Sequence, residues 1–205
     1  MIRELSILKY EIKNPRKAFD EISKEGKAFL IGALVIIALP KVISGFLHTD
    51  FSHLKGIPVS TAEWIISVIL LYFIGRSLKG EANFTGLLSS VGYARFPLIF
   101  LPVLGYLALT SIPEDVVAII QNTPREQISQ EQAMYIVTHI LTPVTVTLSL
   151  IMLVLLLWNF ALSVIAVRES NKFSTWRAFC SAVVVMFIDM FIIARILKAV
   201  TGVGV

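Results

Sequence analysis

Cysteine is nearly absent from the chain, and its absence excludes two classes of protein. Cys180 is the only cysteine among 205 residues, so neither a disulfide framework nor a cysteine-based zinc site can be built. Histidine is scarce too, with three residues, and the nearest approach to a metal-binding motif is His48, Asp50 and His53 in one short segment. A metal site needs a fixed set of ligands and supporting groups that orient them. We therefore interpret this segment as a flexible loop and expect no metal site.

Charged residues are also scarce, and their scarcity argues against a soluble protein. Charged residues make up 16% of the chain, whereas soluble domains carry about 25%. Hydrophobic residues make up 56%, and the mean hydropathy is +0.80. A soluble domain of this size could not bury so much apolar surface, so the lipid bilayer is the expected environment. The net charge of +4 is typical of membrane topology rather than of nucleic-acid binding.

Motifs of catalysis are missing as well. The chain contains neither the phosphate-binding pattern G-x-x-x-x-G-K-[ST] nor the zinc pattern H-E-x-x-H. A serine nucleophile needs a neighbouring base, and His139 is the only histidine that falls within an expected span. An acid pair needs two carboxylates at one site, and we count only Asp189 in the interior of the expected spans. We therefore predict a protein without catalytic activity and without a cofactor.

The N-terminal segment 1–27 is charged and amphipathic. Asn14 followed by Pro15 predicts a helix start, because asparagine caps free amides and the fixed φ of proline suits the first helical position. Apolar residues then recur at helical spacing, namely Ala18, Phe19 and Ile22. We expect a short amphipathic helix on the cytoplasmic membrane surface, with its basic residues toward anionic headgroups.

Residues 28–205 are expected to form a five-span membrane domain, so the predicted fold is all-α and polytopic. The expected spans are residues 28–47, 62–78, 96–112, 136–167 and 178–197. Pro40 is expected to break the first span, and Pro143 to separate a leading turn from the fourth. The third is short for a bilayer, so residues 87–93 are expected to enter the membrane as its leading half.

The distribution of basic residues predicts the orientation. Segments 1–27, 76–95 and 168–177 hold 13 of the 18 lysines and arginines, and the opposite side holds four. Cytoplasmic loops collect such residues. We therefore predict a multi-pass protein of the cell membrane with a cytoplasmic N-terminus and an outer C-terminus.

Four polar residues within the expected spans are candidate functional residues. Lys41 and Asp189 fall at similar depths in the first and fifth spans, and opposite charges at one depth favour a pair because each would be costly alone. The pair could order two helices or could belong to an ion path, and we favour the structural interpretation. Asn159 and Ser163 stand one turn apart and give the fourth span a polar face suited to interhelical hydrogen bonds.

The order of several short motifs resembles the Yip family of Ypt/Rab-interacting membrane proteins across essentially the whole chain. Glycine and tyrosine are followed by proline at Gly92, Tyr93 and Pro97, before the third span. Arginine and glutamate close the fourth span at Arg168 and Glu169. These motifs follow the Asn14-Pro15 segment and precede the sequence Phe173-Ser174-Thr175, in the order typical of the family.

The resemblance implies a non-enzymatic protein that organises membrane or partner proteins, as in trafficking or scaffolding. The sequence leaves open whether the protein forms an oligomer. A small channel or transporter that uses Lys41 and Asp189 is the alternative. Small GTPases are the partners of the eukaryotic members, but the chain lacks their long N-terminal region and the acidic-leucine-tyrosine-glycine-proline motif before the first span. It is more similar to the shorter prokaryotic branch, so GTPase binding is not expected.

Overall fold

The computed structural model describes residues 13–123 and 128–188, and the secondary structure of this part is helical. The elements in chain order are α2 (Pro15–Lys24), α3 (Gly26–Leu47), η1 (Phe51–Lys55), α4 (Gly56–Ser77), α5 (Phe84–Ala94), η2 (Phe96–Phe100), α6 (Leu101–Thr110), α7 (Glu114–Asn122), α8 (Gln130–Ile140), α9 (Pro143–Asn171) and α10 (Thr175–Ile188).

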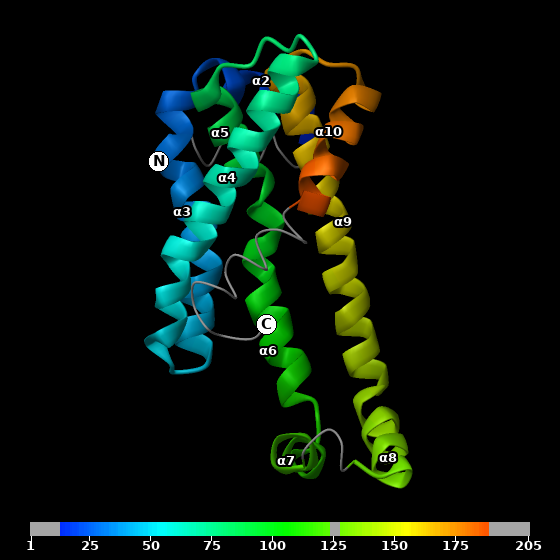
Figure 1. Cartoon of the computed structure of the whole chain (residues 1–205). Helices are drawn as coiled ribbons and strands as arrows, with labels where there is room; N and C mark the ends of the chain where they lie inside the picture. The colour runs from blue at the N-terminus through cyan, green and yellow to red at the C-terminus, as the bar shows by residue number, and fades with distance from the viewer. Residues whose placement is uncertain (1–12, 124–127, 189–205) are drawn as a thin grey trace.

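A bundle of long helices is closed at its two ends by short ones. α5, η2 and α6 follow one another in a central column, with the α3–α4 hairpin on one side and α9 on the other (Figure 1). α10 packs against α4 and α9. α2 lies at one end of the bundle, hereafter the α2 end, and α7 and α8 lie at the opposite end (Figure 1).

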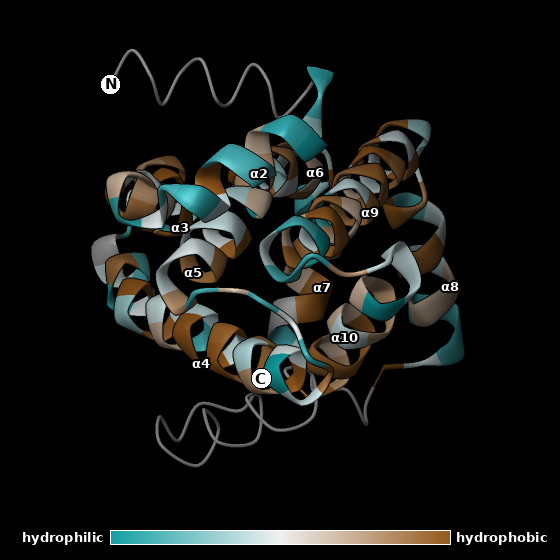
Figure 2. Cartoon of the chain, turned by 90° about the horizontal axis from the view of Figure 1, so that it is seen from above, coloured by the Kyte–Doolittle hydropathy of each residue, from teal (hydrophilic) through white to brown (hydrophobic). Residues whose placement is uncertain are grey.

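Four helical stretches are long and apolar enough to cross a membrane, which fits the predicted polytopic fold. They are Gly26–Leu47, Ser52–Ser77, Phe84–Thr110 and Pro143–Asn171, and α10 is a shorter apolar helix. Large apolar side chains on α9 remain exposed, including Leu150, Val154 and Leu157. Figure 2 shows hydrophobic colouring along the long helices, and hydrophilic colouring on the outward face of α2 and on parts of the helix ends and connecting segments. These apolar surfaces suit contact with lipid.

Local sequence signals explain several helix ends. The side chain of Asn14 accepts a hydrogen bond from the backbone N–H of Lys17 at 3.4 Å, and Pro15 is the first residue of α2. The same kind of cap begins α9, where Thr142 accepts from the N–H of Thr145 and Pro143 is the first helical residue. The predicted starts at Pro15 and Pro143 are confirmed.

Two predictions about the helices were wrong, namely where α4 begins and whether α3 breaks at Pro40. α4 begins at Gly56 rather than at Ala62, because the 3₁₀ turn η1 delivers the chain directly into the helix. α3 continues through Pro40 instead of breaking there. A proline within a helix removes one backbone hydrogen bond, here to the carbonyl of Ile36, and the packing of α3 against α4, α5 and α6 is sufficient to keep the helix continuous.

Candidate functional site

α2 packs against the bundle through its apolar face. Ala18, Phe19 and Ile22 are fully buried, and α2 packs against α5 and α9. The predicted amphipathic helix is confirmed, but its apolar face contacts protein rather than lipid. Its polar face is left outward at the α2 end of the bundle (Figure 2).

Asp20 joins α2 to the C-terminus of α9. One carboxylate oxygen accepts a hydrogen bond from Lys172 Nζ at 2.7 Å, and the other accepts from Lys24 Nζ at 2.6 Å. These bonds, first that of Lys172, hold the pKa of the Asp20 carboxyl below its ordinary value of 3.8. Lys172 caps α9 in the left-handed conformation, with φ 57°. The contact therefore joins residues 152 positions apart.

Glycines at the junction between α2 and α3 and in α5 allow the two backbones to come into direct contact. A Cβ added at Gly26 would lie 2.5 Å from the amide nitrogen of Gly86, and a Cβ at Gly86 would collide with the carbonyl oxygen of Ser23. Hydrogen bonds tie the same junction, since Ser89 Oγ donates to the carbonyl of Gly26 at 2.6 Å and Asn83 Nδ2 donates to that of Ser23 at 3.1 Å. The junction is therefore held against α5 by close backbone contact and by two hydrogen bonds.

The motif residues Gly92, Tyr93 and Pro97 lie inside the bundle. A Cβ at Gly92 would stand 2.5 Å from the Cβ of Ala33, so glycine here allows close contact of α5 with α3. The ring of Tyr93 is buried and meets the ring of Phe29 edge to face at 5.9 Å. Pro97 is buried in the first turn of η2. These positions are explained by helix packing.

The motif residues Arg168 and Glu169 lie at the end of α9, on the α2 end of the bundle. Arg168 Nε is 3.6 Å from Glu169 Oε1, and both side chains are largely buried. Next to them, Asn171 is buried between the ends of helices, where its side chain donates to the carbonyl of Val167 at 3.0 Å. Its backbone carbonyl accepts from the N–H of Glu81 at 3.2 Å, which ties the end of α9 to the loop after α4.

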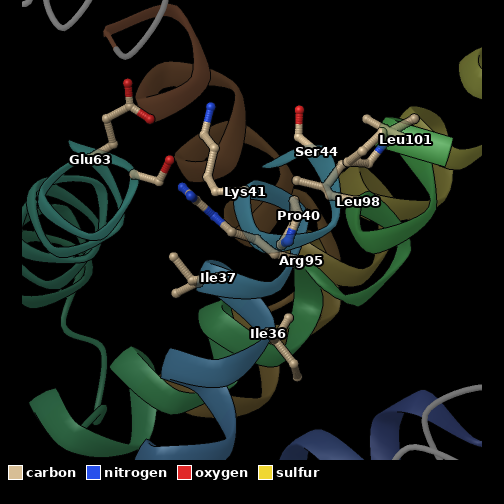
Figure 3. A pocket seen from close by; sticks show the side chains of 11 residues that line it. Ile36, Ile37, Pro40, Lys41, Ser44, Glu63, Arg95, Leu98 and Leu101 are labelled. Carbon is tan, nitrogen blue, oxygen red and sulfur yellow. The ribbon is translucent and has the colours of Figure 1, made fainter. Parts of the chain in front are cut away.

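A pocket of about 430 Å³ lies among α3, α4, η2 and α6, hereafter the polar pocket. Its charged and hydroxyl-bearing walls are Lys41, Ser44, Ser60, Glu63 and Arg95. The remaining walls are apolar: Ile36, Ile37, Pro40, Leu98, Leu101 and Pro102. Figure 3 shows Lys41, Glu63 and Arg95 extending toward the same space from three different elements.

The sequence analysis missed two of these charges. Glu63 is the eighth residue of α4, so it lies roughly 10 Å from that end of the helix. The expected start at Ala62 placed it at the span's edge. Arg95 was assigned to a cytoplasmic loop, yet it follows α5 within the membrane-crossing stretch Phe84–Thr110. The sequence signal that could have placed Arg95 in the bundle was the apolar helical pattern of residues 84–94, which come directly before it. α5 is part of the stretch Phe84–Thr110, so the prediction that residues 87–93 form the leading half of the third span is confirmed.

Of the predicted pair Lys41–Asp189, the structure places only the first residue. Lys41 lines the polar pocket, and its aliphatic stem runs along the first turn of α4, where a Cβ at Gly56 would be 3.2 Å from its Cε. Asp189 lies outside the described residues. The pair therefore stays a prediction.

Asn159 and Ser163 line a second pocket of about 420 Å³ among α4, α5, α9 and α10. Ser163 Oγ donates to the carbonyl of Asn159 at 2.9 Å, within its own helix. Asn159 Oδ1 is buried, and among the described residues it accepts no hydrogen bond. Arg95 lines both this pocket and the polar pocket, so the two polar regions are adjacent. The predicted interhelical bond of Asn159 is untested.

The segment with two histidines is held by local hydrogen bonds. Asp50 accepts from both the N–H and the hydroxyl of Ser52 and so caps η1. His48 Nδ1 lies 3.0 Å from the carbonyl of Ser44, and the rings of His48 and His53 are 5.2 Å apart. Within the described part of the chain, histidine, cysteine and acidic side chains form no group of three that could hold a metal.

Comparison with protein families gives one finding. The family model described as "Yip1 domain" matches residues 11–196, which includes every element described above. Comparison with curated proteins and with solved structures found no significant match.

Proposed function

The chain belongs to the Yip family of multi-pass membrane proteins, and on this basis we propose that it organises membrane or partner proteins without catalysing a reaction. The α2 end of the bundle is the face that we assign to this role. The positive-inside pattern favours a cytoplasmic location for this face.

The observation that carries the proposal is the attachment of α2 to the rest of the bundle. An amphipathic helix that only bound lipid would keep its apolar face for the membrane, whereas Phe19 and Ile22 are buried within the protein. The hydrogen bond that Asp20 accepts from Lys172, and those that Ser89 and Asn83 donate to backbone carbonyls, add fixed points. A helix held in this way presents its polar residues in a constant arrangement, which suits recognition of a protein partner.

Neither an enzyme nor a channel is favoured by a specific arrangement. Among the described residues, His139 hydrogen-bonds through Nδ1 to the carbonyl of Tyr135 and sits at the end of the bundle far from α2. The Lys41–Asp189 alternative has one member outside the described residues.

Site-specific photocrosslinking in native membranes tests the proposal. A photoreactive residue replaces Arg16, which is exposed on α2, and a control replaces Ile31, an apolar residue that is 72% exposed on α3. We expect discrete protein adducts from position 16, reduced in an Asp20→Lys background, and none from position 31. Equal adducts at the two positions, or none at position 16, would contradict the proposal.

A further inference from the structure

The surface of α8 carries an inference that is independent of the α2 end and of its partners. Residues at positions i, i+3 and i+7 share one face of a helix, and Met134, Val137 and Leu141 have this spacing along α8 and its C-cap. These three residues, hereafter the apolar stripe, are 67%, 50% and 62% exposed. Gln132 and His139 lie on the opposite side of the helix. α8 is therefore amphipathic, and its apolar side is open.

The length of α9 places α8 at a membrane surface. α9 has 29 residues, which gives a length of roughly 43 Å, and a bilayer is about 40–45 Å thick with its headgroup regions. Charged residues are costly inside the hydrocarbon, so Arg168 and Glu169 place one end of α9 in the headgroup region next to α2. The other end, at Pro143, consequently reaches the headgroup region of the opposite surface. α8 ends shortly before Pro143, so it lies at that level.

The apolar stripe is continuous with the exposed apolar surface of α9. A groove of about 330 Å³ is lined by Leu141 of the stripe and by residues of α9 that include Val146 and Leu150, and both of these α9 residues are exposed. Viewed along the bundle, α8 lies at the edge of the molecule (Figure 2). The lipid that surrounds the membrane-crossing part of α9 therefore also meets this groove and the stripe beside it.

We propose that α8 lies in the membrane surface opposite the α2 end, with the apolar stripe inserted among the phospholipid chains of that leaflet. Tyr135 fits this depth, because tyrosine rings are enriched at membrane–water interfaces. Its hydroxyl donates a hydrogen bond to the carboxylate of Asp115 on α7. α7 is thereby held at the same surface.

The charge of the two helices favours a neutral lipid surface over an anionic one. α7 and α8 contain three carboxylates, namely Glu114, Asp115 and Glu131, and the sequences of these two helices contain neither lysine nor arginine. Helices that lie on anionic lipids are rich in lysine and arginine on their polar face. Burial of the apolar stripe is therefore what holds α8 at the surface, and attraction to anionic headgroups is not.

Spin labels on single cysteines test the proposal on the full chain in vesicles of phosphatidylcholine. In a Cys180→Ser background, Met134→Cys and Val137→Cys place the label on the apolar stripe. Glu131→Cys is the matched control, because Glu131 is an exposed residue of the same helix outside the stripe. Collision of each label with oxygen, which concentrates in lipid, is compared with collision with a water-soluble nickel chelate.

Two further positions calibrate the ratio of oxygen to nickel collisions. Val154→Cys on α9, where Val154 is 62% exposed, gives the lipid reference, and Arg16→Cys on α2 gives the water reference. We expect the ratio at positions 134 and 137 to shift toward the lipid reference, and the ratio at position 131 to stay near the water reference. Vesicles of phosphatidylglycerol should not shift positions 134 and 137 further toward lipid.

Equal ratios at positions 131, 134 and 137 would overturn the proposal, because α8 would then lie wholly in water or wholly in hydrocarbon. Exclusion of both reagents from positions 134 and 137 would overturn it as well, since a protein surface such as a second copy of the chain would then cover the stripe. A deeper position in phosphatidylglycerol than in phosphatidylcholine would overturn the assignment to a neutral lipid surface.

Discussion

Single residues hold α2 and the junction after it against the rest of the bundle. Gly26 and Gly86 let two backbones touch where any side chain would collide, and Asp20 adds a charged link to Lys172. Neither contact could be deduced from the sequence, since glycine and aspartate are common in loops and near helix ends. The partners of these residues are set by how α2, α5 and α9 come together.

Replacement of Gly86 by valine should destabilise the protein. The new side chain would meet the carbonyl oxygen of Ser23, and overpacking of this kind costs about 1–3 kcal/mol. Gly105→Ala is the matched control, because a Cβ there has nothing within 4 Å. Thermal unfolding in detergent should show a lowered Tm for Gly86→Val and an equal or higher Tm for Gly105→Ala. Equal values for the two variants would contradict the close contact.

Asp20 should make the attachment of α2 sensitive to acid. The pKa of its carboxyl is lowered in the folded chain by the bonds to Lys172 and Lys24, so the stabilisation is present above the ordinary value of 3.8 and is lost as pH falls through the lowered pKa. Proteolysis or hydrogen exchange of residues 15–24 between pH 7 and pH 3 should show α2 opening more readily in acid. Asp20→Asn should open more readily at pH 7 and lose part of this pH dependence; an unchanged profile would contradict the link.

The predicted Lys41–Asp189 pair has a direct test in a double-mutant cycle. Breaking a buried pair from one side costs about 3–5 kcal/mol, whereas replacing both charges by apolar groups is often neutral. If the pair forms, Lys41→Met and Asp189→Leu each lower the Tm in detergent, and the double variant recovers much of the loss. Strictly additive losses would reject the pair and leave Lys41 with the described groups of the polar pocket.

At the scale of elements, prediction succeeded where a local signal is sufficient. Asn14-Pro15 and Thr142-Pro143 cap and begin helices through contacts within four residues, so the sequence alone contains the cause. The apolar pattern of residues 87–93 likewise identified the leading half of the third span. The long apolar runs and the high share of hydrophobic residues were sufficient to predict the polytopic fold.

Prediction failed where packing overrides the local signal. Pro40 is a helix breaker in isolation, but α3 continues through it because three other elements hold the helix. Glu63 and Arg95 are members of the candidate site only because α4 starts earlier than expected and α5 enters the bundle. Charges near the end of an apolar run are ordinarily interfacial, so no pattern distinguished Glu63 from a residue at the edge of a span, whereas the apolar helical pattern of residues 84–94 was a signal for Arg95.

At the scale of the whole molecule, the two ends of the bundle differ in their construction. The α2 end is closed by a helix locked to the bundle through buried side chains and charged links. The opposite end carries α7 and α8, which are joined by a hydrogen bond from the Tyr135 hydroxyl to the Asp115 carboxylate. This asymmetry, together with the charge distribution, is the basis for assigning the α2 end to the cytoplasm and to partner proteins.

The central claim is that the α2 end of this multi-pass protein faces the cytoplasm, and cysteine labelling in intact cells tests it most directly. In a Cys180→Ser background, single cysteines replace Arg16 on α2 and Ile120 on α7, both exposed positions. A membrane-impermeant thiol reagent should label position 120 in intact cells and label position 16 only after permeabilisation. Labelling of position 16 in intact cells, alone or together with position 120, would contradict the account.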